Sequence, residues 1–345
     1  MKKNLLFTCA GRRNYLINYF KKALNGNGIV AAADSDIYAP ALEEADVAFC
    51  VPNILDTEYI PKLKEIIKDY EINAIISLND LELPILSKYR YELESKNTKV
   101  IISNEHIIDI GFDKWKTYQF IKKIGLNTPK TFININKAIE ALENGKLKFP
   151  VIIKPRWGHG SIGIESPETM KELMLVYELQ KIKLKRTVLN KIKEKDIESS
   201  ILIQEKLDGK EYGLDIVNNF DGKYFGTFVK QKISMRNGET DKAQSVKDAD
   251  FERVGREIGG HLKHIGSMDV DAFLVDNKLF ILELNPRFGG GYPFSHEAGA
   301  NIAAVYIDWL KGYSNEEVLK HINYQGNIIS SKYDRLIQIS KKKDI

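Results

Sequence analysis

Residues 267–291 read Ser267-Met-Asp-Val-Asp-Ala-Phe-Leu-Val-Asp-Asn-Lys-Leu-Phe-Ile-Leu-Glu-Leu-Asn-Pro-Arg-Phe-Gly-Gly-Gly291. Two apolar runs flank Asp276-Asn277-Lys278, whose residue types favour a tight turn, so the stretch predicts a β-hairpin. Asp271, Glu283 and Asn285 interrupt the apolar runs. A turn centred on the middle turn residue places Asp271 opposite Glu283, and residues two apart on a strand share a face. The three side chains are therefore expected on one patch of the hairpin.

This patch has the chemistry of a magnesium site. Two carboxylates and an amide oxygen are hard ligands, and such a set suits Mg²⁺ that is also held by phosphate groups. A half-exposed hairpin with ordinary surface polar residues is the competing interpretation. The register favours the metal site, as does Arg287 with the three glycines after it, which places a cation beside the carboxylates. Asp271, Glu283 and Asn285 are the predicted metal ligands.

The composition is that of an ordinary globular protein. The chain has 345 residues, 43% hydrophobic and 28% charged, enough for two or three domains or subdomains. Its net charge of +4 does not indicate a nucleic acid or membrane partner. Cys9 and Cys50 lie in apolar runs and predict buried thiols. The first apolar run is too short for a signal peptide, and no run approaches the ~20 residues of a membrane span. A reducing, cytoplasmic setting is expected.

Residues 1–104 alternate short apolar runs with helical patterns, which predicts a doubly wound parallel sheet. Functional residues in such sheets follow the carboxyl ends of the strands, which here carry Gly11-Arg12-Arg13-Asn14, Asp34 with Asp36, and Asn79-Asp80. The first of these loops lacks the second and third glycines of the dinucleotide fingerprint, so a nicotinamide site is not expected. Arg12 and Arg13 either hold an anionic substrate or are solvated at a helix start.

Residues 105–320 predict a second domain that contains a smaller unit at 130–209, expected to act as a mobile lid. Within the unit, the glycine-rich loop up to Gly163 follows Lys154 and is either a phosphate-binding loop or a plain turn. The basic run 181–198 lacks interleaved aromatic residues and favours a solvated helix face over a nucleic acid site.

Later segments are less informative taken singly. A strand is expected over 223–232, a loop over 234–240 and a helix over 251–265. Residues 321–345 are expected to form a C-terminal tail that is frayed from Ser330, because lysines dominate its end.

Several of these motifs occur in an order that resembles the ATP-grasp superfamily: Lys114, Lys154 with its glycine-rich loop, Gln204-Glu205-Lys206-Leu207, Glu211, Asp271 and Glu283-Leu-Asn-Pro-Arg287. The likeness is greatest to the ATP-binding modules of the carbamoyl phosphate synthase large subunit and its stand-alone relatives. Residues 1–104 are similar to the pre-ATP-grasp domain of those enzymes. The implied fold is α/β in the N-terminal domain and α+β in a two-subdomain ATP-grasp part.

The resemblance implies a role for each motif. The implied nucleotide-binding residues are Lys114, Lys154, Gly158, His159, Gly160, Ser161, Gln204, Glu205, Leu207 and Glu211. The two lysines would contact the ATP phosphates from two sides, and the glycine-rich loop would fold over them. The 204–207 stretch would meet adenine, and Glu211 would meet ribose. Arg287 would face the transferred phosphoryl group, and Lys232 is the second predicted catalytic residue.

The implied activity is that of an ATP- and Mg²⁺-dependent ligase, in which Mn²⁺ is expected to substitute. It would join a carboxylate to an amine or a thiol through an acyl phosphate and release ADP and phosphate. A kinase that stops at the phosphorylated product and a non-catalytic nucleotide sensor are the alternatives. Small-molecule carboxylate and amine substrates are the expected partners, with neither nucleic acid nor membrane, and a homodimer is left open. The acceptor is expected between Arg12 or Arg13, Asn79-Asp80, residues 235–240 and Gly289–Gly291.

Overall fold

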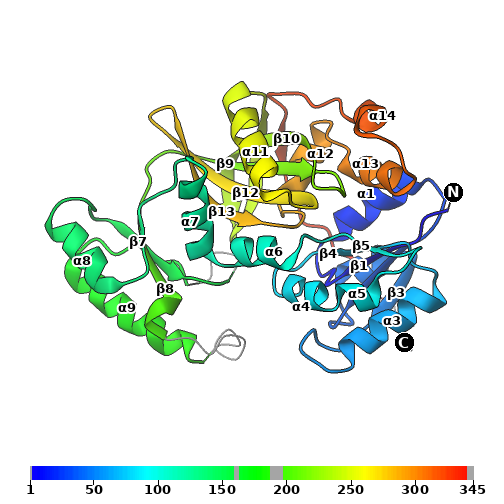
Figure 1. The fold of residues 1–345 in the computed structure, drawn as a ribbon, viewed down its shortest axis with the longest axis horizontal. Coiled ribbons are helices and arrows are strands. Elements are labelled where there is room, and N and C mark those ends of the chain that lie inside the picture. The colour runs from blue at the N-terminus through cyan, green and yellow to red at the C-terminus, as the bar shows by residue number, and fades with distance from the viewer. Residues whose placement is uncertain (1, 159–162, 187–196, 340–345) are drawn as a thin grey trace.

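The computed structural model describes residues 2–158, 163–186 and 197–339, which form three β-sheets joined and covered by helices (Figure 1). The predicted site residues His159, Gly160 and Ser161 lie outside the described residues. The first sheet is parallel, the second is antiparallel with six strands, and the third is a small antiparallel sheet. The predicted combination of an α/β N-terminal domain and an α+β ATP-grasp part is confirmed.

The N-terminal domain is a doubly wound sheet with the strand order β3-β2-β1-β4-β5 and parallel pairing throughout. Its elements are β1 (Leu5–Thr8), α1 (Asn14–Leu24), β2 (Val30–Asp34), α2 (Pro40–Glu44), β3 (Val47–Cys50), α3 (Tyr59–Asp69), β4 (Ala74–Ser77), α4 (Leu83–Lys88), α5 (Arg90–Leu93) and β5 (Lys99–Val100). The strand order reverses between β1 and β4. Loops at such a switch point face a shared crevice, and here they carry Arg13 and Asp80.

Apolar packing joins this domain to the rest of the chain. Leu5 and Phe7 of β1 are buried on one face of the sheet, whereas Leu6 between them is buried on the other. The cluster that contains Phe7 also contains Phe288 and Tyr306 of the ATP-grasp part. Each fully buried side chain of this kind contributes about 1.5–3 kcal/mol, so the two parts share a stabilised core. The loops of the two parts are consequently held next to each other by a common core.

The six-stranded sheet has the order β13-β12-β9-β10-β11-β14. Its strands are β9 (Lys210–Asn218), β10 (Tyr224–Arg236), β11 (Glu239–Val246), β12 (Gly266–Val275), β13 (Lys278–Asn285) and β14 (Ile329–Ser331). Two sets of helices pack with it: α6 (Glu105–Phe112), α7 (Lys114–Lys123) and α11 (Ala249–Leu262), and α12 (Tyr292–Glu297) and α13 (Ile302–Leu310), followed by α14 (Asn315–Val318) and η2 (Leu319–His321). Ile216 joins the first set and Val217 the second, so the two sets cover opposite faces.

Two expectations about this sheet are wrong. The predicted loop over 234–240 is a continuous hairpin, in which β10 extends to Arg236 and turns through Asn237 (φ 52°) and Gly238 (φ 77°) into β11. Asn-Gly is the pair that a type I′ turn favours, so the residue types at this turn agree with the observed hairpin. The C-terminal tail is not frayed at Ser330, which pairs with β11. Buried Tyr324 anchors the segment by donating a hydrogen bond to the carbonyl of Val229.

The third sheet belongs to the unit predicted at 130–209. It consists of β6 (Thr131–Phe132), β7 (Val151–Pro155) and β8 (Ile201–Glu205) in the order β6-β8-β7, with α8 (Ile135–Glu143), α9 (Met170–Leu184) and η1 (Ile197–Ser200). Ile153, Leu173 and Ile203 belong to a core of its own. Figure 1 shows this unit at the opposite end of the molecule from the N-terminal domain. A separate core suits a unit that moves as one body, although its role as a lid stays a prediction.

Candidate active site

The hairpin of β12 and β13 brings Asp271 and Glu283 opposite each other, as predicted. Asp276 (φ 47°) and Asn277 (φ 58°) form the turn, and two positive φ values are typical of type I′. This two-residue turn alone would pair Asp271 with position 282. A register shift between Asp271 and Ala272 leaves Leu282 unpaired and restores the predicted pairing. The bulge therefore aims Glu283 at the same patch as Asp271.

Asp269 lies on the same face and was missed by the sequence interpretation. It pairs with Asn285 in the register and is two residues before Asp271, so the available signal was the same alternation. The Asn285 amide donates a long hydrogen bond, 3.4 Å, to the Asp269 carbonyl. Burial raises the pKa of Asp269 against the opposing effect of Lys230 and Arg287. The face thus carries three carboxylates and one amide.

Lysines neutralise this patch from two sides. Lys114 Nζ lies 3.4 Å from Glu283 Oε2 and donates to the carbonyl of Gly158 at 2.5 Å. On the other side, Lys232 Nζ donates to Asp271 Oδ1 at 2.6 Å and to Glu211 Oε1 at 2.7 Å. Such charge-assisted hydrogen bonds are stronger than neutral ones. Glu211, predicted to meet ribose, therefore lies next to the hairpin patch.

The environment treats the two opposing carboxylates differently. Burial is the main influence on Asp271 and raises its pKa to about 6. Burial would also raise the pKa of Glu283, but the ammonium groups of Lys114, Lys154 and Lys232 bring it to about 2. Glu283 is consequently ionised across the neutral range. A metal cation that displaced the lysine ammonium groups would therefore bind a negatively charged carboxylate.

The helix start of α7 fixes Lys114. The Asp113 side chain caps the helix by accepting from the backbone N–H of Trp115 at 3.1 Å. Asp113 also accepts two hydrogen bonds from Arg156, both 2.7 Å, and its side chain is fully buried. This pair ties the end of β7 to α7, so Lys114 projects from a defined position toward Gly158.

Lys154 is held by Gln204 inside the small third sheet. Lys154 is 5% exposed, and its ammonium donates to Gln204 Oε1 at 2.8 Å. Gln204 Nε2 donates in turn to Thr131 Oγ1 at 2.8 Å. Both ends of the Gln204 side chain are therefore occupied, and Gln204 orients the Lys154 ammonium. Its contact with adenine and the contact of Lys154 with phosphate stay predictions. Burial lowers the pKa of Lys154 to about 8.

Other predicted nucleotide residues lie where the third sheet meets the six-stranded one. Glu205 ends β8, and its carboxylate accepts from the backbone N–H of Lys130 at 3.1 Å. Leu207 is half-buried in the connection from β8 to β9. Their contacts with adenine stay predictions.

Arg287 links the hairpin to the N-terminal domain. Its Nη2 donates to Asp80 Oδ2 at 2.5 Å, and its Nη1 donates to the Phe288 carbonyl at 3.0 Å. Nη1 also lies 3.8 Å from Asp269 Oδ2. The guanidinium is therefore anchored on one side and close to the carboxylate patch on the other.

The expected acceptor region also comes together. Arg13 Nη1 donates to the Tyr15 hydroxyl at 2.7 Å, and Arg13 Nη2 lies 3.7 Å from Glu239 Oε1, at the start of β11. A Cβ added at Gly290 would lie 3.0 Å from Arg13 Nη1, so the glycine loop touches the same place. Arg12 is exposed. Of the two arginines, Arg13 is the one that lies beside Glu239 and the glycine loop.

Close approach explains the glycine run. A Cβ at Gly289 would lie 2.2 Å from the Asp269 carboxyl carbon, and one at Gly291 would lie 2.7 Å from Lys230 Cε. Lys230 was not predicted as a site residue; it is 1% exposed and donates to Asp215 Oδ2 at 2.7 Å. The run lets the chain pass directly over this buried ion pair.

The donor set fits a divalent cation of the magnesium type. Within residues 2–158, 163–186 and 197–339, no three His, Cys, Asp or Glu side chains are grouped to hold a metal ion. The predicted set has two carboxylates, from Asp271 and Glu283, and the amide of Asn285, all hard oxygen donors on one face. Mg²⁺ commonly uses one or two carboxylates and completes its shell with phosphate and water.

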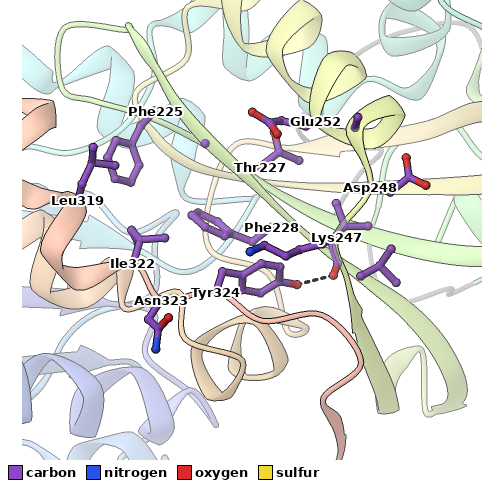
Figure 2. A pocket seen from close by; sticks show the side chains of 14 residues that line it. Phe225, Thr227, Phe228, Lys247, Asp248, Glu252, Leu319, Ile322, Asn323 and Tyr324 are labelled. Carbon is purple, nitrogen blue, oxygen red and sulfur yellow. Dashed lines mark hydrogen bonds between the residues drawn. The ribbon is translucent and has the colours of Figure 1, made fainter.

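A cavity of about 520 Å³ lies away from these residues (Figure 2). It is lined by parts of β10, the start of α11 and residues 319–324. Phe228 and Tyr324 form one wall, with ring centroids 5.3 Å apart. The cavity includes none of the predicted site residues, so it is not a candidate for the nucleotide site.

In the described part of the chain, no helix has the length and apolar character needed to cross a membrane.

Comparison with known families identifies the fold. An ATP-grasp domain model matches residues 112–291, and a PylC-like N-terminal domain model matches residues 5–101. The first match covers more than half of the chain, so the protein belongs to the ATP-grasp family. At the level of the family, the predicted class of enzyme, an ATP-grasp ligase, is confirmed.

Individual relatives are distant. The chain is 23% identical over 325 residues to a carbamoyl-phosphate synthase from Methanobrevibacter smithii, covering 89% of this chain and 81% of that one. It is 22% identical over 277 residues to the carbamoyl phosphate synthase large chain of Campylobacter jejuni, covering 74% of this chain but only 24% of that longer protein.

A solved structure shares the fold. It is the biotin carboxylase domain dimer of 2-oxoglutarate carboxylase from Hydrogenobacter thermophilus, in complex with MgADP, ADP and bicarbonate. The TM-score is 0.72 at 17% identity, with 95% of this chain and 74% of that chain covered. The likeness is one of fold.

Proposed function

We propose that the protein is an ATP- and Mg²⁺-dependent ligase that joins a carboxylate to an amine or a thiol through an acyl phosphate. The observation that carries the proposal is the Asp271–Glu283 pair, with Lys114 on one side and Lys232 on the other. Membership of the ATP-grasp family supports ATP as a substrate, and the MgADP in the related carboxylase domain supports Mg²⁺. Mn²⁺ is expected to replace it, since it takes the same oxygen ligands.

Nucleotide binding falls to residues from both sheets. Lys114 and Lys154 hold the triphosphate, and Gly158 continues into the loop expected to cover it. The 204–207 stretch meets adenine, and Glu211 meets ribose. A divalent ion held by Asp271, Glu283 and Asn285 would neutralise charge on the phosphate oxygens.

The first chemical step is transfer of the γ-phosphoryl group. A carboxylate oxygen of the acceptor forms a bond to the γ-phosphorus, the bond to the β,γ-bridging oxygen breaks, and ADP leaves with the electron pair. Arg287 and Lys232 stabilise charge on the transferred group, because phosphoryl transfer depends mainly on positioning and electrostatics. The Asp80 contact keeps the Arg287 fork in a fixed plane.

The second step forms the product. A neutral amine or a thiolate attacks the acyl carbon, the bond to the phosphate oxygen breaks, and inorganic phosphate leaves. An attacking amine also loses a proton to solvent. The substrates are small molecules, and a homodimer stays a prediction that sedimentation would test.

An isotope experiment tests this function. The protein is incubated with ATP, Mg²⁺ and a panel of carboxylates and amines, and ADP release identifies active pairs. The active acid is then supplied with ¹⁸O in its carboxylate. We expect one ¹⁸O in inorganic phosphate and an amide or thioester product. A stable acyl phosphate without coupling favours the kinase, no ADP release with any pair favours the sensor, and AMP formation overturns the proposal.

A further inference from the structure

Charged side chains of alternating sign lead away from the expected phosphoryl site at Arg287. Asp80 accepts from Arg287 at 2.5 Å, Arg287 lies 3.8 Å from Asp269, and Glu239 lies 3.7 Å from Arg13. The negative charge of Asp269 also contributes to raising the pKa of Arg13. A carboxylate that reacts beside Arg287 would therefore point the rest of its molecule toward Arg13 and Glu239.

Glu239 is the negative end of this row. Its side chain is 52% exposed, and it lies at the first residue of β11, immediately after the Asn237-Gly238 turn. A Cβ at Gly290 would be 3.3 Å from its carboxyl carbon, so a glycine there keeps this side of the carboxylate uncrowded. A carboxylate next to an arginine can receive a cation while the arginine receives an anion.

The ammonium group of Lys332 forms an ion pair with Glu239. Lys332, directly after β14, has its Nζ 3.1 Å from Glu239 Oε2, whereas Arg13 lies near the other oxygen. The neighbouring pair of Arg236 and Asp334, 2.6 Å apart, holds this C-terminal segment against the turn. The lysine thus has the position and the chemistry that a substrate ammonium would have.

We propose that Glu239 is the cation-binding residue of the acceptor site, that the acceptor carries an ammonium group besides its reacting carboxylate, and that Lys332 occupies Glu239 until the acceptor displaces it. This inference rests on the proposed function, since it assumes that a carboxylate acceptor binds beside Arg287. The bound ammonium stays protonated on Glu239, so it is not the attacking amine. The acceptor class is therefore an amino acid activated at its carboxylate.

Substitutions of Glu239 and Lys332 are expected to change the affinity for the acceptor in opposite directions. Glu239→Gln removes the negative charge, and we expect acceptor affinity to fall about ten-fold or more, because a charge-assisted hydrogen bond is lost. Lys332→Met removes the competitor, and we expect affinity to rise about two- to five-fold, the range of an exposed ion pair. In the double variant the Lys332→Met effect should vanish.

Calorimetry measures this without turnover. The protein, preloaded with Mg²⁺ and a non-hydrolysable ATP analogue, is titrated with α-, β- and ω-amino acids and with the desamino acid of each binder. Lys242→Met, exposed on the same strand as Glu239, is the matched control and should leave affinity unchanged. Binding of the analogue itself should be equal in all variants.

The outcomes separate the two claims. Weaker acceptor binding in Lys332→Met, a desamino acid that binds as tightly as its amino acid, or no amino acid binding to Lys332→Met would each overturn the inference. Failure of the wild-type protein to bind the analogue would instead overturn the proposed function. Amino acid binding that follows the predicted signs without ADP release would keep the cation site and reject the ligase.

Discussion

Arg287, just beyond the hairpin, donates a hydrogen bond to Asp80 of the N-terminal domain, 207 positions away in the chain. Their side chains are 9% and 11% exposed. The arginine expected to meet the transferred phosphoryl group is thus oriented by the domain that contributes Arg13 to the acceptor region. We therefore expect phosphoryl alignment to depend on this pair of side chains.

Arg287→Lys should lower kcat about 100-fold or more. Lysine keeps the charge but lacks the planar fork that reaches Asp80 and the phosphoryl group together. The affinity for an ATP analogue should change little, because Arg287 acts on the transferred group. ADP release and analogue titration measure the two effects, and equal losses in both would contradict this role.

Asp80→Asn should have a smaller effect on kcat, about ten-fold, because Arg287 is kept but loses its charged anchor. Removing one partner of a nearly buried pair should also lower the free energy of unfolding by about 1–3 kcal/mol. Asp69→Asn, exposed at the end of α3, is the control and should behave as wild type. A kcat equal to wild type in Asp80→Asn would show that Arg287 is positioned without it.

Lys154 predicts a pH dependence of nucleotide binding. Its pKa of about 8 lies below its usual 10.5, so the free protein loses this charge as the pH rises through 8. Analogue affinity should therefore fall above pH 8, by at most about ten-fold per pH unit. The pH dependence of folding stability has the opposite sign to that of nucleotide affinity. The buried ammonium lowers stability below pH 8, and this loss disappears as the pH rises from 8 to 10.5. Lys154→Met should bind weakly at every pH, with a flat profile.

Gln204→Leu should act through Lys154. The lysine loses its acceptor and Thr131 its donor, so we expect a destabilisation of about 1–3 kcal/mol and about ten-fold weaker analogue binding. Gln204→Glu keeps an acceptor and adds a charge, which should raise the pKa of Lys154 and move the loss of affinity to a higher pH than in the wild type. An unshifted pH profile in Gln204→Glu would argue that Gln204 does not set the state of Lys154.

Much of the fold could be predicted because many of its elements depend on residues that are close together in the sequence. The short apolar runs of β1 and β4 and the turn at Asp276-Asn277 each depend on neighbouring residues. The pairing of Asp271 with Glu283 was also predictable. The bulge at Leu282 that produces this register could not be predicted from the sequence.

Long-range contacts account for most of what was missed. Gln204 contacts Lys154 and Thr131, which are 50 and 73 positions away, and no periodicity in its own strand reveals them. The docking of Tyr324 on Val229 joins residues 95 apart. The Asn237-Gly238 turn was different, since its signal was local and was outweighed by the polar character of the surrounding residues.

The central claim is that the carboxylates of the hairpin hold a divalent ion beneath the ATP phosphates, and Glu283→Gln tests it. The variant keeps the shape and one oxygen but loses the charge that a divalent ion requires. Without metal, nucleotide binding should be unchanged or tighter, because a carboxylate near the phosphates is gone. That measurement also shows that the variant is folded. Glu316→Gln, exposed in α14, is the control.

The decisive quantity is the factor by which Mg²⁺ tightens binding of a non-hydrolysable ATP analogue, measured by calorimetry with and without the metal. We predict that this factor falls about ten-fold or more in Glu283→Gln and stays at the wild-type value in Glu316→Gln. A Glu283→Gln protein that retains the full wild-type enhancement by Mg²⁺ would contradict the metal site.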